Sequence, residues 1–177
     1  RPPPGEKDNE ALRRNLGYAQ LQSGDIPGAK KTLTELVTDC PSNALNRFDL
    51  ALTLAAGGDN ENAIKQTKAG LLLYPEAEGK ILYSDLLEAV GGPLLDEAIE
   101  LFRKNEMDKA LAILEPLCER FPDYAKAQAY LGHASNLKLP PDRKKAEKAY
   151  RAALAATRYV PLSRQDLAVI YDNLGSI

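Results

Sequence analysis

The chain has 177 residues, which is long enough for one ordinary domain with a sizeable core. Its 44% hydrophobic and 27% charged residues are typical of a soluble globular protein, and its formal net charge of −2 excludes a general electrostatic attraction to nucleic acid or membranes. No apolar run reaches the roughly 20 residues that cross a bilayer, so we expect no direct membrane insertion. The compartment, cytoplasmic or envelope-associated, is left open.

Residues 1–9, RPPPGEKDN, contain three consecutive prolines, which favour an extended conformation and do not fit inside a helix. We predict a Pro-rich flexible linker over 1–9 and a repeat domain over 10–177. A proline-rich ligand for a partner domain is the alternative interpretation, but it lacks a PxxP spacing. The linker suggests that the domain is tethered to a larger assembly.

From Glu10 onward apolar residues recur at three- and four-residue steps, which predicts helices and no strand. Breaks rich in glycine and proline separate helical segments of about 12 to 16 residues. Asp25 and Asp59 each follow a glycine and precede a helix, where a carboxylate accepts hydrogen bonds from free backbone amides. The sequence therefore predicts a series of helical hairpins.

Four pairs of residues recur with one period of 34 residues. The pairs are Gly24 and Gly58, Asp25 and Asp59, Ala29 and Ala63, and Pro41 and Pro75. With two helices per period, nearly the whole chain resembles the tetratricopeptide repeat (TPR) family. That family favours leucine and a small residue in the first helix, a small residue in the second and a closing proline. The matching residues are Leu16, Gly17, Ala29 and Pro41; Leu50, Ala51, Ala63 and Pro75; Ala98, Ala110 and Pro122; and Leu131, Gly132 and Ala146.

The resemblance implies an all-α fold, a right-handed α-solenoid of about four TPR-like hairpins with an inserted helix and a C-terminal capping helix. Ala63 and Ala110 are 47 residues apart, 13 more than the period, so 78–90 is predicted to be the insertion. This helix either breaks the superhelix, fills part of its groove, or pairs with 93–104 and shifts the repeat phase. The expected units are 10–43, 44–77, 91–124 and 125–160, with the capping helix over 162–177.

The resemblance also implies a function. TPR proteins usually bind extended peptides or helices in a concave groove lined by their first helices. We therefore expect a non-enzymatic protein–protein interaction scaffold whose partner is a protein or peptide. Ordinary repeat packing, or cover by the inserted helix, is the alternative explanation for the apolar members of the projected groove. The predicted contact residues are Arg14, Tyr18, Phe48, Leu52, Leu95, Ile99, Phe102 and His133.

Two more specific ligand classes receive little support. Some TPR proteins hold a chaperone C-terminus with a lysine and asparagine clamp, but Arg14, Tyr18 and Asp49 stand at those places, and Asp49 repels a terminal carboxylate. A basic face with Lys144, Lys148 and Arg151 is compatible with phosphate, but second helices of this family mostly face outward, and a solvated helix face explains the same residues. Nucleic acid is therefore not the expected partner.

No catalytic signature and no metal-ligand spacing is present in the sequence. His133 is the single histidine, and Cys40 and Cys118 are interpreted as packing thiols, so we predict no catalytic residue, metal or cofactor. Two alternatives remain for the function. The chain is either a self-association module that forms a homo-oligomer, or an accessory domain of an enzyme whose catalytic part lies outside these residues.

Overall fold

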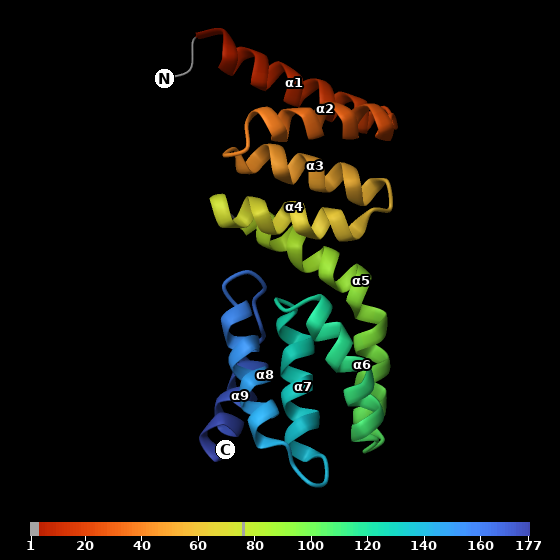
Figure 1. Ribbon diagram of the computed structural model, residues 1–177, viewed down its shortest axis with the longest axis vertical. Coiled ribbons are helices and arrows are strands. Elements are labelled where there is room, and N and C mark those ends of the chain that lie inside the picture. Colours follow the sequence, from red (N-terminus) through yellow and green to blue (C-terminus); the bar gives the residue numbers. More distant parts are fainter. Residues whose placement is uncertain (1–3, 76) are drawn as a thin grey trace. The chain divides into compact units, whose positions relative to one another are not determined.

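The computed structural model describes the backbone of residues 4–75 and 77–177, and these residues contain helices and no strand. The helices follow one another along the chain with short connections (Figure 1). Their bounds are α1 Pro4–Gln22, α2 Ile26–Asp39, α3 Ala44–Ala56, α4 Asn60–Leu73, α5 Ala77–Arg103, α6 Met107–Arg120, α7 Ala125–Leu137, α8 Arg143–Ala156 and α9 Arg164–Ser176.

The helices fall into two compact units, residues 1–86 and 87–177. In unit 1, α1 packs on α2, α2 on α3, and α3 on α4. In unit 2, α6 packs on α7, α7 on α8, and α8 on α9. Helix α5 contributes its first part to unit 1 and the remainder to unit 2. Each unit is thus a series of helices packed on their neighbours in the chain, as the repeat predicted.

The turns between paired helices have the predicted chemistry. Gly24 and Gly58 adopt φ angles of 82° and 81°, in the left-handed region that glycine enters without steric cost. The side chain of Asp25 accepts a hydrogen bond from the Gly28 amide at 3.0 Å, and the side chain of Asp59 caps α4 in the same way. The Gly-Asp pair therefore reverses the chain and starts the second helix in the two hairpins of unit 1, α1–α2 and α3–α4.

Small residues let the paired helices approach closely. Ala29, Ala63, Ala110 and Ala146, the predicted small residues of the second helices, are all fully buried. A Cβ atom added at Gly17 would lie 2.6 Å from Cγ of Leu33 on the opposite helix of the same hairpin. The alanines recur along the chain because each occupies a corresponding helix–helix contact.

A polar contact fixes α1 against the start of α3. One carboxylate oxygen of Glu10 accepts hydrogen bonds from the side-chain amides of Asn43 at 2.7 Å and Asn46 at 2.8 Å. Asn46 is fully buried. The hydrogen bond from Asn46 is the main cause that lowers the pKa of Glu10, and it outweighs the opposing effect of burial. The folded state therefore favours the charged form of this carboxylate.

In unit 2, α9 closes the end of the helical series. Its Ile170 is fully buried against side chains of α7 and α8, and it joins a core cluster with Ala129, Tyr150 and Ala153. A Cβ atom at Gly132 would lie 2.5 Å from the Tyr150 ring, so α7 and α8 also meet through a glycine. The C-terminal helix caps the last hairpin, as expected.

The structure differs from the sequence prediction at two places. Helix α1 begins at Pro4, so the predicted linker is helical over its described part, while residues 1–3 lie outside the described residues. The predicted boundary between the insertion 78–90 and the unit that begins at 91 is absent, because α5 runs unbroken through Gly91-Gly92-Pro93. Gly91 instead permits close packing, since its Cβ atom would lie 2.8 Å from the Tyr124 ring. The segments 78–90 and 93–103 therefore belong to one helix.

Candidate functional site

Unit 1 carries a groove of about 440 Å³ between side chains of α1, α3 and the first part of α5. We call it the unit-1 groove. It is lined by Arg14, Leu45, Phe48, Asp49, Leu52, Glu78, Gly79, Ile81, Leu82 and Asp85.

Two helical stripes form the walls of the unit-1 groove. The α3 residues stand at steps of three and four residues, and so do those of α5, so each set lies on one face of its helix. Leu52 is 43% exposed and Ile81 is 61% exposed, although both are large aliphatic residues. The groove thus leaves apolar surface in contact with solvent along both walls.

Phe48 forms a rigid part of the groove. It is only 8% exposed, because its ring lies between Gly70 of α4 and Gly79 of α5. A Cβ atom at Gly70 would approach the Phe48 ring to 2.5 Å, and one at Gly79 would approach it to 2.6 Å. The two glycines therefore leave room for the aromatic ring, which is buried while the aliphatic side chains of the groove are exposed.

The charges of the unit-1 groove are unbalanced. Nε of Arg14 donates to Oδ2 of Asp49 at 2.6 Å, which neutralises one carboxylate. Glu78 and Asp85 are exposed and form no ion pair with the described part of the chain. Because the remaining charged lining residues are both acidic, the groove favours cationic groups at its α5 wall.

Unit 2 contains a second, smaller pocket of about 300 Å³ between α5, α7, α8 and α9. The rings of Phe102 and Tyr130 meet edge to face at 5.8 Å, and Tyr130 meets His133 in the same way at 5.9 Å. Nδ1 of His133 lies 2.9 Å from the hydroxyl of Tyr150. Burial lowers the pKa of His133, although the nearby Asp166 opposes that shift. The neutral imidazole is therefore favoured inside this aromatic cluster.

The structure separates the predicted contact residues into four groups. Arg14, Phe48 and Leu52 line the unit-1 groove. Phe102 and His133 line the unit-2 pocket, and Tyr18 is exposed on α1. Leu95 is fully buried and Ile99 is 8% exposed, so core packing accounts for their apolar character.

Sequence reasoning missed the α5 wall of the unit-1 groove. Glu78, Ile81, Leu82 and Asp85 fall inside the segment that the repeat spacing marks as an insertion. Their spacing of three, four and seven residues is visible in the sequence and marks one helix face. The signal is present, but the repeat pattern does not indicate which surface of unit 1 this helix completes.

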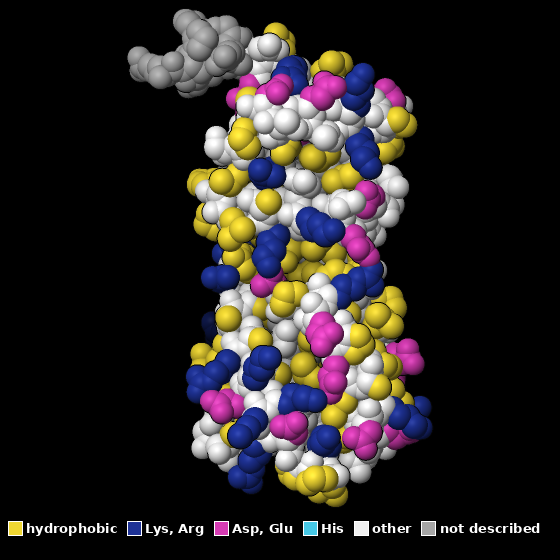
Figure 2. All heavy atoms as spheres, viewed as in Figure 1, with side chains coloured by type: hydrophobic (Ala, Val, Ile, Leu, Met, Phe, Trp, Pro, Cys, Tyr) yellow, Lys and Arg dark blue, Asp and Glu magenta, His cyan; other side chains and the backbone are white. Residues whose placement is uncertain are grey.

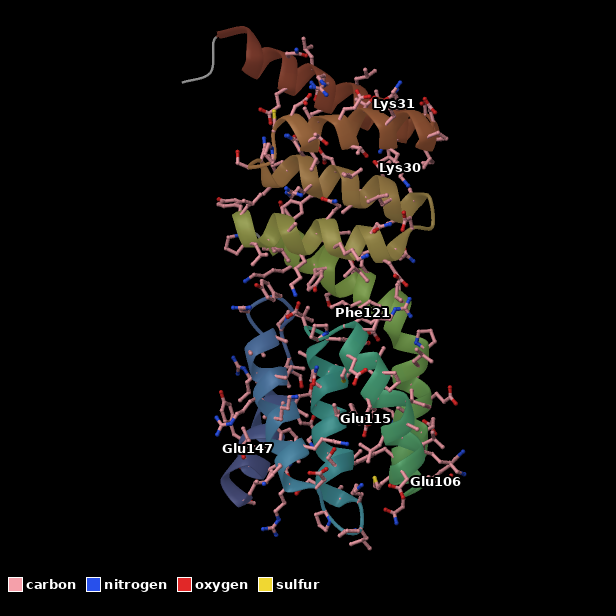
Figure 3. The ribbon with its side chains drawn as sticks, viewed as in Figure 1. Lys30, Lys31, Glu106, Glu115, Phe121 and Glu147 are labelled. Atoms are coloured by element: carbon pink, nitrogen blue, oxygen red, sulfur yellow. The ribbon has the colours of Figure 1, made fainter. Side chains whose placement is uncertain are left out.

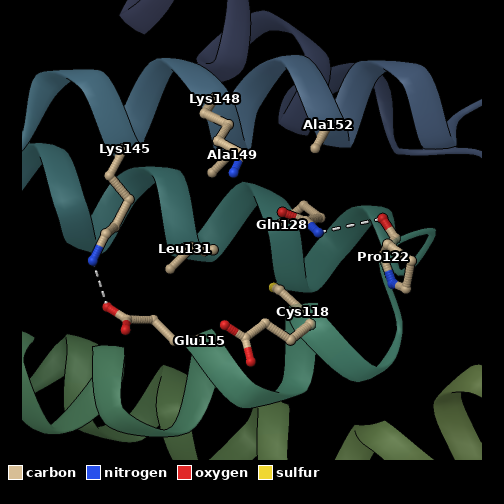
Figure 4. A pocket seen from close by; sticks show the side chains of 10 residues that line it. Glu115, Cys118, Pro122, Gln128, Leu131, Lys145, Lys148, Ala149 and Ala152 are labelled. Atoms are coloured by element: carbon tan, nitrogen blue, oxygen red, sulfur yellow. Dashed lines mark hydrogen bonds and ion pairs between the residues drawn. The ribbon is translucent and has the colours of Figure 1, made fainter.

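A third cleft, of about 400 Å³, lies on unit 2 between α6 and α8, with Leu131 of α7 at its base (Figure 4). The ammonium of Lys145 reaches across to Glu115 at 2.7 Å. Arg151 pairs with Glu147 at 2.8 Å on α8. Glu115 and Glu147 are labelled in Figure 3, and Figure 2 shows acidic and basic side chains interspersed over this unit. The predicted basic face therefore carries mixed charge.

The described residues contain no group of three or more histidine, cysteine, aspartate or glutamate side chains placed to hold a metal ion. Cys118 is buried, and burial raises the pKa of its thiol to about 12, so it remains protonated near neutral pH. Among the same residues, no helix is both long enough and apolar enough to span a bilayer.

No protein-family model and no curated protein matches the chain. Among solved structures, the chain is similar to a thermophilic TPR protein of Thermus thermophilus, with a TM-score of 0.44, 23% identity, and coverage of 94% of this chain and 83% of that one. The chain is also similar to MamA from Desulfovibrio magneticus, with a TM-score of 0.42, 19% identity, and coverage of 96% of this chain and 89% of that one. For Pseudomonas aeruginosa pilF the TM-score is 0.39 and the identity 18%, with coverage of 97% of this chain and 78% of that one.

These TM-scores lie below 0.5, so the fold is identified by features of the chain itself. The features are the 34-residue period and the Gly-Asp turns of unit 1, and the buried alanine in each second helix of both units. Together they show that the two units are built from TPR-like helical hairpins.

Proposed function

We propose that the chain is a non-enzymatic protein-interaction module that binds an apolar segment of a partner protein in the unit-1 groove. One observation carries the proposal. Leu45, Leu52 and Ile81 remain exposed along a single groove, above the buried ring of Phe48. Contiguous exposed apolar surface of this kind commonly marks an interaction site.

The energetics favour such a partner. Burying one leucine or isoleucine side chain is worth roughly 1.5 to 3 kcal/mol, so a segment that covers Leu52 and Ile81 gains a substantial free energy of binding. Phe48 is already held by Gly70 and Gly79 in the free protein, which reduces the ordering cost on binding. The groove is therefore partly preorganised for an apolar ligand.

Affinity capture with matched variants tests the proposal. Leu52→Glu places a charge in the groove, whereas Leu12→Glu places one at an exposed leucine of α1. Leu12 lies two residues before Arg14, so it is on the opposite face of α1 from the groove. We expect Leu52→Glu to release partner proteins that the wild-type chain and Leu12→Glu both retain. Equal capture by all three folded proteins would contradict the proposal.

Self-association is a separate outcome of the same experiment. If the protein captured through Leu52 is a second copy of this chain, light scattering of the purified protein will show a mass that rises with concentration. That rise should be absent in Leu52→Glu and present in Leu12→Glu. A heterologous partner predicts a constant mass for all three proteins.

A further inference from the structure

We propose that the segment bound by the unit-1 groove is an amphipathic helix that carries lysine or arginine at two positions seven residues apart, with apolar residues between them. This inference rests on the function proposed above and adds the chemistry of the partner. It is carried by the arrangement of charge on α5, which is independent of the apolar lining.

The α5 wall has an acidic residue at each end and apolar residues in the middle. Glu78 and Asp85 are seven residues apart, and Ile81 and Leu82 stand between them. Seven residues correspond to two turns, so both carboxylates lie on one face, roughly 10 Å apart along the helix at 1.5 Å per residue. The wall therefore has the order acidic, apolar, acidic along one line.

The opposite wall has a different electrostatic character. On α3 the only carboxylate that lines the groove is Asp49, and Arg14 of α1 holds it at 2.6 Å. Leu45 and Leu52 complete that side and are exposed. A ligand thus meets an apolar surface along α3 and two carboxylates without an ion-pair partner in the described chain along α5.

A helix matches this wall in period as well as in charge. On a partner helix, residues i and i+7 lie on the same face at the same separation as Glu78 and Asp85, and residues i+3 and i+4 lie between them. Basic side chains at i and i+7 meet both carboxylates, while apolar residues at i+3 and i+4 cover Ile81 and Leu82. An acidic segment of the same shape meets repulsion at both ends.

A displayed library of random 16-residue peptides tests the inference without knowledge of the natural partner. Peptides selected on the wild-type protein are sequenced, and their affinities are measured for Glu78→Gln/Asp85→Asn, for Leu52→Glu and for the matched control Glu35→Gln/Glu97→Gln. Glu35 and Glu97 are exposed on other helix surfaces, so the control removes the same charge outside the groove.

We expect selected peptides to be enriched in basic residues seven positions apart around an apolar pair. Their affinity should fall about five- to tenfold in Glu78→Gln/Asp85→Asn and remain unchanged in the control. The difference in affinity between the wild type and Glu78→Gln/Asp85→Asn should become smaller as salt is added. Peptides that need Leu52 but show no basic preference would overturn this inference and leave the proposed function intact. If no selected peptide depends on Leu52, both proposals are wrong.

Discussion

Arg14 of α1 binds Asp49 of α3 at 2.6 Å inside the unit-1 groove, and the Asp49 side chain is only 18% exposed. The ion pair joins two helices that both contribute to the groove. It also removes one of the three carboxylates of the lining from competition for a cationic ligand. Its loss therefore has consequences for both stability and binding.

Replacing Arg14 with glutamine tests this pair. Because the pair is partly exposed, we expect the free energy of unfolding in urea to fall by at most about 1 kcal/mol. Affinity for a peptide with two basic residues should rise, since Asp49 is then unpaired. Arg13→Gln is the matched control, because it breaks the 2.6 Å pair between Arg13 and Asp39 outside the groove lining. Weaker binding of the basic peptide by Arg14→Gln would contradict this role.

Because Gly132 packs closely against Tyr150, we predict that a larger residue at position 132 destabilises the protein. In Gly132→Ala the new Cβ atom lies 2.5 Å from the ring of Tyr150, which is fully buried. Overpacking costs about 1 to 3 kcal/mol, partly offset by the higher helix propensity of alanine. We therefore expect the free energy of unfolding in urea to fall by about 1 to 2 kcal/mol. Gly175→Ala, which has no atom within 4 Å of the new Cβ, should be neutral or stabilising.

The hydrogen bonds of Glu10 predict an acid-dependent loss of stability. The pKa of Glu10 is lowered from its ordinary value of 4.5, mainly by the Asn46 amide, so the unfolded chain takes up the proton first. The contribution of the carboxylate is present above about pH 4.5 and is lost as the pH falls through the lower folded pKa. In urea unfolding, the free energies of unfolding of Glu10→Gln and of the wild type should converge as the pH falls through this acidic range. A difference that stays constant with pH would contradict this.

For His133 we predict a second pH-dependent change in stability, at higher pH than that of Glu10. Burial lowers its pKa below 6.5, so the unfolded state binds a proton that the folded state disfavours. Stability should therefore decline as the pH falls below about 6.5, until the folded imidazole also becomes protonated. His133→Gln should remove this decline, and NMR titration of the imidazole should give a midpoint below 6.5. A midpoint at or above that value would refute the assignment.

The 34-residue spacing of small residues predicted the hairpins, because close helix packing and tight turns accept only a few residue types. Few residues can replace a buried alanine between packed helices or a glycine with positive φ. The repeat positions of Ala29 and Gly58 can therefore be recognised from the sequence. The turn before α6 is harder to recognise. Its left-handed residue is Asn105, with a φ of 62°, and the following Glu106 has no capping bond from its side chain.

The lining of the unit-1 groove was only partly predictable from the sequence. The repeat pattern placed Arg14, Phe48 and Leu52 on the inner faces of the first helices, and these three residues line the groove. It did not identify Ile81, because the packing of α5 on Phe48 depends on two glycines on different helices, Gly70 and Gly79. The same tertiary contact decides which acidic residues face the groove.

Site-specific photo-cross-linking from Ile81 tests the central claim most directly. A photoreactive amino acid is placed at Ile81, which is 61% exposed in the unit-1 groove, and at the control position Leu12, which is 68% exposed on the far face of α1. Both proteins are expressed in the source organism and irradiated. We predict a specific protein adduct from position 81 that is absent from position 12. Identical adducts at both positions, or adducts from position 12 alone, would contradict the claim that this groove holds the partner.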